Sequence, residues 1–180
     1  MSVLELLNRV RPKGDAVAIV SLNLMPSVVE SFSLYVSRFS AWEVTSAAPE
    51  NPLLASRAYL VPTSSPLLLV QEDGRTFLRP FKAPPGTSRE HLLAAFLRSA
   101  AEDFGERGRA VLLPGASRGA LAGLDSVGGA GGRIFVQSPE SSHDPDFLSE
   151  AQSMASHFAD VATLSRSLSS ELHVVNRGNR

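Results

Sequence analysis

Residues 109–142 read RAVLL-PGASRG-ALAGLDSV-GGAGG-RIFV-QSPESS. Two short apolar runs, 109–113 and 133–136, flank a segment of small residues that is compatible with a helix. Apolar runs that alternate with helical segments predict a βαβ unit with parallel strands. The glycine-punctuated turn at 114–119 and the polar run at 137–142 then both follow the carboxyl ends of strands, where the functional loops of open α/β sheets lie.

The rest of the chain continues the alternation of strands and helices. Short apolar runs bounded by breakers predict strands at 16–21, 42–44, 58–61, 67–71, 76–80 and 160–162. Apolar residues at helical spacing predict helices at 2–10, 27–39, 87–104, 145–158 and 165–172. Glu72-Asp73-Gly74 is the turn signal of a hairpin.

Two of these helices carry specific expectations. In the helix at 27–39, the spacing of Val28, Phe32, Val36 and Phe39 predicts the face that packs inward. The helix that follows 82–86 opens on Thr87 and Glu90, three residues apart, which is the pattern of a capping box. Its predicted apolar face comprises Leu93, Phe96, Leu97, Ala100 and Phe104.

Composition limits the possible functions. The 180 residues suit one domain, 1–180, with a polar tail at 173–180, and 43% of them are hydrophobic, which is enough for a core. The net charge is −1 and there is no basic stripe, so we expect neither nucleic-acid binding nor membrane insertion. The chain has no cysteine, no signal-like start and no membrane-length apolar run, so we expect a cytoplasmic protein without disulfides or thiolate chemistry.

The turn after the run at 109–113 contains a literal G-x-S-x-G pattern, with Ser117 at its centre. Between a strand and a helix, this pattern is typical of a nucleophile elbow. A serine nucleophile also needs a base within hydrogen-bond reach. The chain has four histidines, and only His143 is predicted at the same end of the sheet as Ser117. A Ser117–His143 esterase site is therefore one alternative, and a structural glycine turn is the other.

Two further patterns have plain structural explanations. Ser141-Ser142-His143-Asp144 places triad residue types in a row, but adjacent side chains rarely converge, so a polar loop with Asp144 as a helix cap is favoured. No second histidine or cysteine joins His143 in a metal-ligand pattern, so we expect no metal. The glycines at 128–132 precede a strand instead of a helix, which argues against a phosphate cradle, and we expect no cofactor.

The chain resembles the catalytic domain of CheB-type chemotaxis methylesterases. That family typically reads (V/L)LxGMGxDGaxGL…AGGxxxaQdxxSS, where this chain reads LLPGASRGALAGL…AGGRIFVQSPESS. Upstream, 57–62 resembles the family's "vYiAP" strand, and 67–75 resembles its "HLLVxxDGR" hairpin. The resemblance implies a three-layer α/β/α fold with a mostly parallel sheet plus a small β-hairpin.

Members of that family hydrolyse glutamate methyl esters on chemoreceptors with a serine, a histidine and an aspartate. The family's serine lies in a GxSTGG turn after a first strand, and neither that turn nor that strand is found in this sequence. The family's histidine falls on Leu24, or on Asn23 with a one-residue slip, and its aspartate falls on Gly119. Since leucine and glycine can neither accept a proton nor orient a base, the resemblance implies a degenerate, inactive relative.

An inactive relative would bind a partner protein without hydrolysing its methyl esters. We expect a regulatory module that binds a protein partner, either a chemoreceptor or another chemosensory protein. The missing first strand would leave a sheet edge to be covered by the 16–21 strand, a helix, a partner chain or a second copy in a homo-oligomer. The predicted binding cleft comprises Asn23, Leu24, Ser117, Arg118, Gly119, Gln137, Ser141 and Ser142.

Overall fold

Two groups of three parallel strands form the centre of the computed structural model, which describes residues 2–138 and 145–174. The first group has the order β1-β3-β2, and the second has the order β6-β7-β8. Their bounds are β1 (Ala18–Leu22), β2 (Glu43–Ser46), β3 (Arg57–Pro62), β6 (Arg109–Leu112), β7 (Arg133–Gln137) and β8 (His157–Ala159). The predicted βαβ unit is confirmed, because β6 and β7 pair in parallel with a helix between them.

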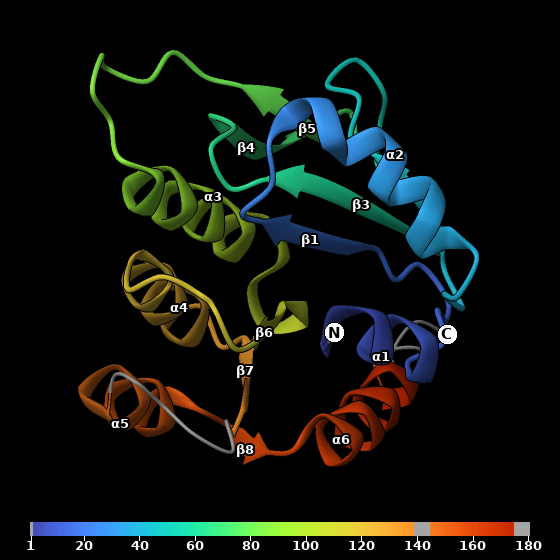
Figure 1. Cartoon of the computed structure of the whole chain (residues 1–180), viewed down its shortest axis with the longest axis vertical. Helices are drawn as coiled ribbons and strands as arrows, with labels where there is room; N and C mark the ends of the chain where they lie inside the picture. The colour runs from blue at the N-terminus through green and yellow to red at the C-terminus, as the bar shows by residue number, and fades with distance from the viewer. Residues whose placement is uncertain (1, 139–144, 175–180) are drawn as a thin grey trace.

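Helices cover both faces of these strands (Figure 1). Buried side chains of α1, α2 and α6 share one apolar cluster, and those of α3, α4 and α5 share another. The bounds are α1 (Ser2–Arg9), α2 (Pro26–Ser37), α3 (Arg89–Phe104), α4 (Gly119–Gly129), α5 (Pro145–Met154) and α6 (Val161–Val174), with a 3-10 turn at Gly105–Arg107. This is the predicted three-layer α/β/α arrangement.

The predicted hairpin is β4 (Leu67–Glu72) and β5 (Arg75–Pro80), which pair antiparallel. Its turn residues Asp73 and Gly74 have φ of 50° and 73°. Positive φ at both central residues is the geometry that matches the twist of a two-residue hairpin. The hairpin packs on α3, where Leu69 N–H donates to Ser99 Oγ at 2.9 Å.

Several predicted boundaries in the last third of the chain are wrong. The helix expected at 145–158 ends at Met154, and His157 begins β8 instead of lying in a helix. The expected strand at 160–162 is the start of α6, because the Asp160 carboxylate accepts hydrogen bonds from Thr163 N and Oγ1 and caps that helix. The tail beyond residue 174 lies outside the described residues.

The inward face of α2 also differs from the prediction. Val36 is fully buried, but Val28 and Phe39 are 38% and 54% exposed. Val29 and Ser33 take the inward positions, and the Ser33 hydroxyl is satisfied by donating to Glu30 O at 2.7 Å. The hydrophobic spacing failed here because Leu34 and Tyr35 are apolar on the outer face as well.

The N-cap of α3 also differs from the prediction. Ser88, not Thr87, is the N-cap residue, and its Oγ accepts a hydrogen bond from His91 N at 3.3 Å. Thr87 Oγ1 instead donates to Pro84 O at 2.6 Å. Serine and threonine are both suitable N-cap residues. Because the Thr87 hydroxyl is engaged with Pro84 in the preceding turn, Ser88 is the residue that caps the helix.

Candidate functional site

The loops after β1 and β6 meet at the first turn of α3. Asn23, which follows β1, accepts a hydrogen bond through Oδ1 from Arg89 Nη1 at 2.7 Å. Gly119, which begins α4, lies so close to Glu90 that a Cβ built on it would be 2.4 Å from the Glu90 Cα. The start of α3 therefore contacts two of the predicted cleft positions, one from each group of strands.

The predicted nucleophile, Ser117, lies in a turn where Gly115 has a φ of 90°. Its backbone carbonyl accepts from Ala120 N at the start of α4, but its Oγ is buried and bonds to none of the described residues. His91 Nδ1 lies 2.9 Å from Ser88 Oγ, and His157 Nε2 lies 3.1 Å from Glu171 Oε1, so neither imidazole serves Ser117. His143 lies outside the described residues, so the Ser117–His143 pair stays a prediction.

The sequence comparison predicted that the family's histidine falls on Leu24 or Asn23 and its aspartate on Gly119. Leu24 is partly buried against the apolar cluster of α1, α2 and α6. Gly119 has no side chain, and the α3 backbone at Glu90 leaves no room for one. This close approach had no signal in the sequence, because glycine is also common in turns.

The remaining predicted cleft residues are only partly brought together. Gln137 ends β7, and its side-chain Oε1 is buried with no hydrogen-bond partner among the described residues. Arg118 points to α5, where its Nη1 lies 3.9 Å from Glu150 Oε2. Ser141 and Ser142 lie outside the described residues.

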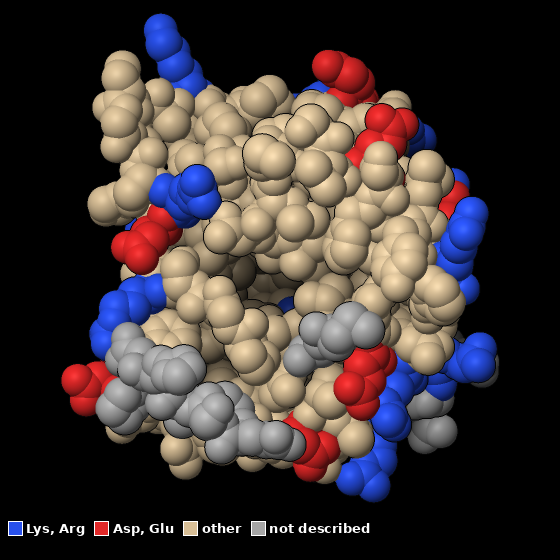
Figure 2. All heavy atoms as spheres, in the orientation of Figure 1, with Lys and Arg blue, Asp and Glu red and all other residues tan. Residues whose placement is uncertain are grey.

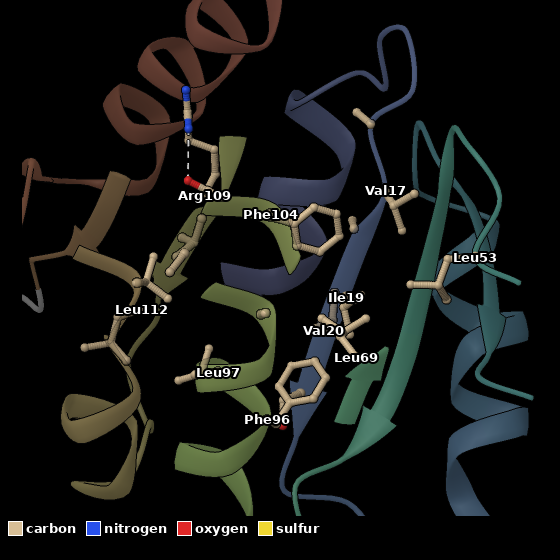
Figure 3. Close-up of a pocket in the computed structure, with 18 of the residues that line it drawn as sticks. Val17, Ile19, Val20, Leu53, Leu69, Phe96, Leu97, Phe104, Arg109 and Leu112 are labelled. Carbon is tan, nitrogen blue, oxygen red and sulfur yellow. Dashed lines mark hydrogen bonds between the residues drawn. The ribbon is translucent and has the colours of Figure 1, made fainter. Parts of the chain in front are cut away.

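A cavity of about 1240 Å³ opens between β1 and β6, and sequence reasoning did not predict it. Figure 2 shows the hollow in the middle of this face of the molecule. The cavity is lined mainly by apolar side chains of β1, β6 and α3, among them Ile19, Phe96, Phe104 and Leu112 (Figure 3). Asn23 and Ser117 line the cavity just beyond the carboxyl ends of β1 and β6, respectively. Within 2–138 and 145–174, no cluster of three or more metal-ligating side chains occurs.

A charged cluster ties the second group of strands to α6. Glu171 Oε2 lies 2.6 Å from Arg109 Nε, and its other oxygen faces His157. The His157 ring stacks on the buried Phe135 ring at a centroid distance of 4.7 Å. These contacts join β6 and β8 to α6.

None of the described helices has the length and apolar character needed to cross a membrane.

Comparisons with known proteins agree with this architecture. The family model described as CheB methylesterase matches residues 1–167. The crystal structure of the Thermotoga maritima CheB methylesterase catalytic domain superposes with a TM-score of 0.80 at 18% identity, covering 96% of this chain and 91% of that chain. A search of curated proteins gave no significant match. The family match over most of the chain, together with the shared fold, shows that this chain belongs to the CheB methylesterase family.

Proposed function

We propose that this chain is a non-catalytic member of its family and acts as a cytoplasmic binding module in chemosensory signalling. The observation that carries the proposal is at Gly119, the position of the family's aspartate. A side chain there would overlap the α3 backbone at Glu90, so no carboxylate can stand at this point without moving a helix.

The position of the family's histidine supports the same conclusion. A triad works because an imidazole takes the proton of the nucleophile while a carboxylate orients the ring and stabilises its charge. Leu24 supplies no proton acceptor, and neighbouring Asn23 is bonded to Arg89. Ester hydrolysis by the family's mechanism therefore lacks both its base and its acid.

The partner we propose is a chemoreceptor or another chemosensory protein, in keeping with the family. Exposed apolar side chains on α2 and beside its ends support a protein partner, because exposed apolar surface marks contact sites. They are Met25, Leu34, Tyr35 and Phe39, each at least 49% exposed, and the rings of Tyr35 and Phe39 lie 5.3 Å apart. Self-association through the same surface is the competing outcome.

The decisive experiment is a methanol-release assay on methylated chemoreceptor, run in parallel with a direct binding measurement. The Thermotoga maritima catalytic domain is the positive control for turnover. We expect no release above background from this chain, and saturable binding to the receptor's cytoplasmic segment in calorimetry. Methanol release by the purified chain would refute the inactive assignment, and absence of binding would refute the partner.

A second candidate, a serine esterase using Ser117, has one specific observation in its favour. Ser117 lies in a strand-to-helix turn that lines the cavity, and its buried Oγ has no partner in the described part of the chain. A fluorophosphonate probe tests it directly. Labelling of the folded protein that disappears in Ser117→Ala, and also in His143→Ala, would establish the esterase; we expect no label on the folded chain.

A further inference from the structure

The residues that line the central cavity include two unbroken runs, one along β1 and one along β6. Every residue from 15 to 23 and from 107 to 117 borders it. Successive side chains of a strand point to opposite faces, so a cavity above one face would touch only alternate residues. The cavity therefore adjoins the edges of β1 and β6, and it also extends over one face of β1 toward Leu53 and Leu69.

These two edges have no strand beside them in the described sheet. β1 pairs with β3 along all of its length, and β6 pairs with β7, but the pairings among residues 2–138 and 145–174 include none on the opposite edges. Exposure follows the same pattern. Every residue of β1 is partly exposed, whereas Ala58, Tyr59, Leu60 and Val61 of its neighbour β3 are buried.

Contacts at both ends show that β1 and β6 run in the same direction. At the amino end, Arg107 Nη1 lies 3.9 Å from Asp15 Oδ2, just before the two strands begin. At the carboxyl end, the first turn of α3 contacts Asn23 on one side and Gly119 on the other. Figure 3 shows the same alignment, with Val17 and Arg109 at one end of the cavity.

The cavity has apolar walls above and below the plane of the strands. Phe96, Leu97 and Phe104 of α3 form one wall, and Leu6, Leu7 and Val10 of the α1 region form the other. An occupant must therefore place apolar side chains on both of its faces. Buried parallel strands have this character, and five residues of such a strand extend about 17 Å.

We propose that this slot binds an extended apolar segment of a second polypeptide chain as a parallel strand between β1 and β6. Backbone hydrogen bonding selects a peptide, because β1 and β6 present edge N–H and C=O groups that an acyl chain cannot satisfy. The inserted strand would join the two groups of strands into one continuous sheet. This proposal deepens the binding role given above and rests on it for the identity of the partner, but it depends on a different surface.

The test uses a synthetic nine-residue peptide with a central Val-Ile-Val-Ile-Val run and flanking lysines. Its control is the same peptide with N-methyl groups on alternate backbone nitrogens, which keeps the apolar side chains and removes hydrogen-bond donors. Hydrogen exchange is followed at the amides of 18–22 and 109–112. We expect the amides that face the cavity to exchange at least about tenfold more slowly with the peptide, and the melting temperature to rise by about 5 °C at saturation.

A matched pair of variants locates the effect. Ala100 borders the cavity, and Ala95, five residues earlier on the same helix, does not. We expect Ala100→Trp to abolish peptide binding and Ala95→Trp to preserve it, with circular dichroism confirming that both fold.

Equal protection of the strand amides by the N-methyl peptide, or no protection by the parent peptide, would overturn the proposal. Dimerisation of the chain that Ala100→Trp abolishes would also overturn it, by assigning the slot to a second copy. If receptor binding fails while the peptide binds, the proposed function falls and the strand site stands.

Discussion

At the scale of single residues, Gly119 shows how one missing side chain sets the distance between two helices. The α3 backbone at Glu90 occupies the space where a Cβ would lie. One turn further along α4, Gly123 allows the Leu97 side chain the same close approach. The packing of α3 on α4 and the lack of an acid at 119 therefore have the same cause.

Gly119→Ala is expected to destabilise the protein by about 1–3 kcal/mol, because the added methyl forces α3 and α4 apart. Gly129→Ala is the control, since a Cβ there meets nothing within 4 Å and alanine favours a helix by up to about 1 kcal/mol. Urea unfolding followed by fluorescence of the single tryptophan, Trp42, measures both. Equal stability of the two variants would contradict the close approach.

At the scale of elements, α2 is apolar on two sides, and only packing distinguishes them. Val36 is fully buried beneath the helix, whereas neighbouring Leu34 is 66% exposed. Val36→Ala should cost about 1–3 kcal/mol through the cavity it leaves. Leu34→Ala should change the free energy of unfolding by less than about 0.5 kcal/mol. A larger loss at Leu34 would show that α2 packs in a different rotation.

The cap of α6 gives the protein one predictable response to acid. Hydrogen bonds from Thr163 to the carboxylate hold the pKa of Asp160 below its ordinary value. The stabilisation is therefore complete above the unfolded pKa, near pH 4, and is lost as the pH falls through the folded pKa. Thermal melts of wild type and Asp160→Ala should differ at pH 7, and the difference should shrink as the pH falls below the unfolded pKa. A difference that stays constant as the pH is lowered would rule out this origin.

At the scale of the whole molecule, Glu171 of α6 contacts two strands of the second group, β6 and β8. Its carboxylate faces both Arg109 at the start of β6 and His157 at the start of β8. Glu171→Gln should lower the free energy of unfolding by about 1–3 kcal/mol, because two charge-assisted contacts are weakened in a mostly buried site. Glu5→Gln breaks only the exposed pair with Arg9 and should cost less than about 0.5 kcal/mol.

Among residues 2–138 and 145–174, the two groups of strands share no ladder and are connected through loops and helices. Arg107 and Asp15 face each other at one end, and α3 contacts both groups at the other. Between these ends lies the cavity (Figure 3). The proposed strand site occupies this cavity.

The sequence by itself determined the alternation of strands and helices, the hairpin at Asp73-Gly74 and the family. Each depends on local signals: apolar periodicity, turn residues that accept positive φ, and glycines at fixed spacing. The sequence also predicts the loss of the family's base and acid, from the match of Leu24 and Gly119 to the family's motifs.

Only the tertiary structure decided which face of α2 is buried, that His157 lies in a strand, and that Gly119 has no room for a side chain. It alone showed the slot between β1 and β6. These features depend on contacts between segments far apart in the chain, such as Gly119 with Glu90 and β1 with β3, which local periodicity does not encode.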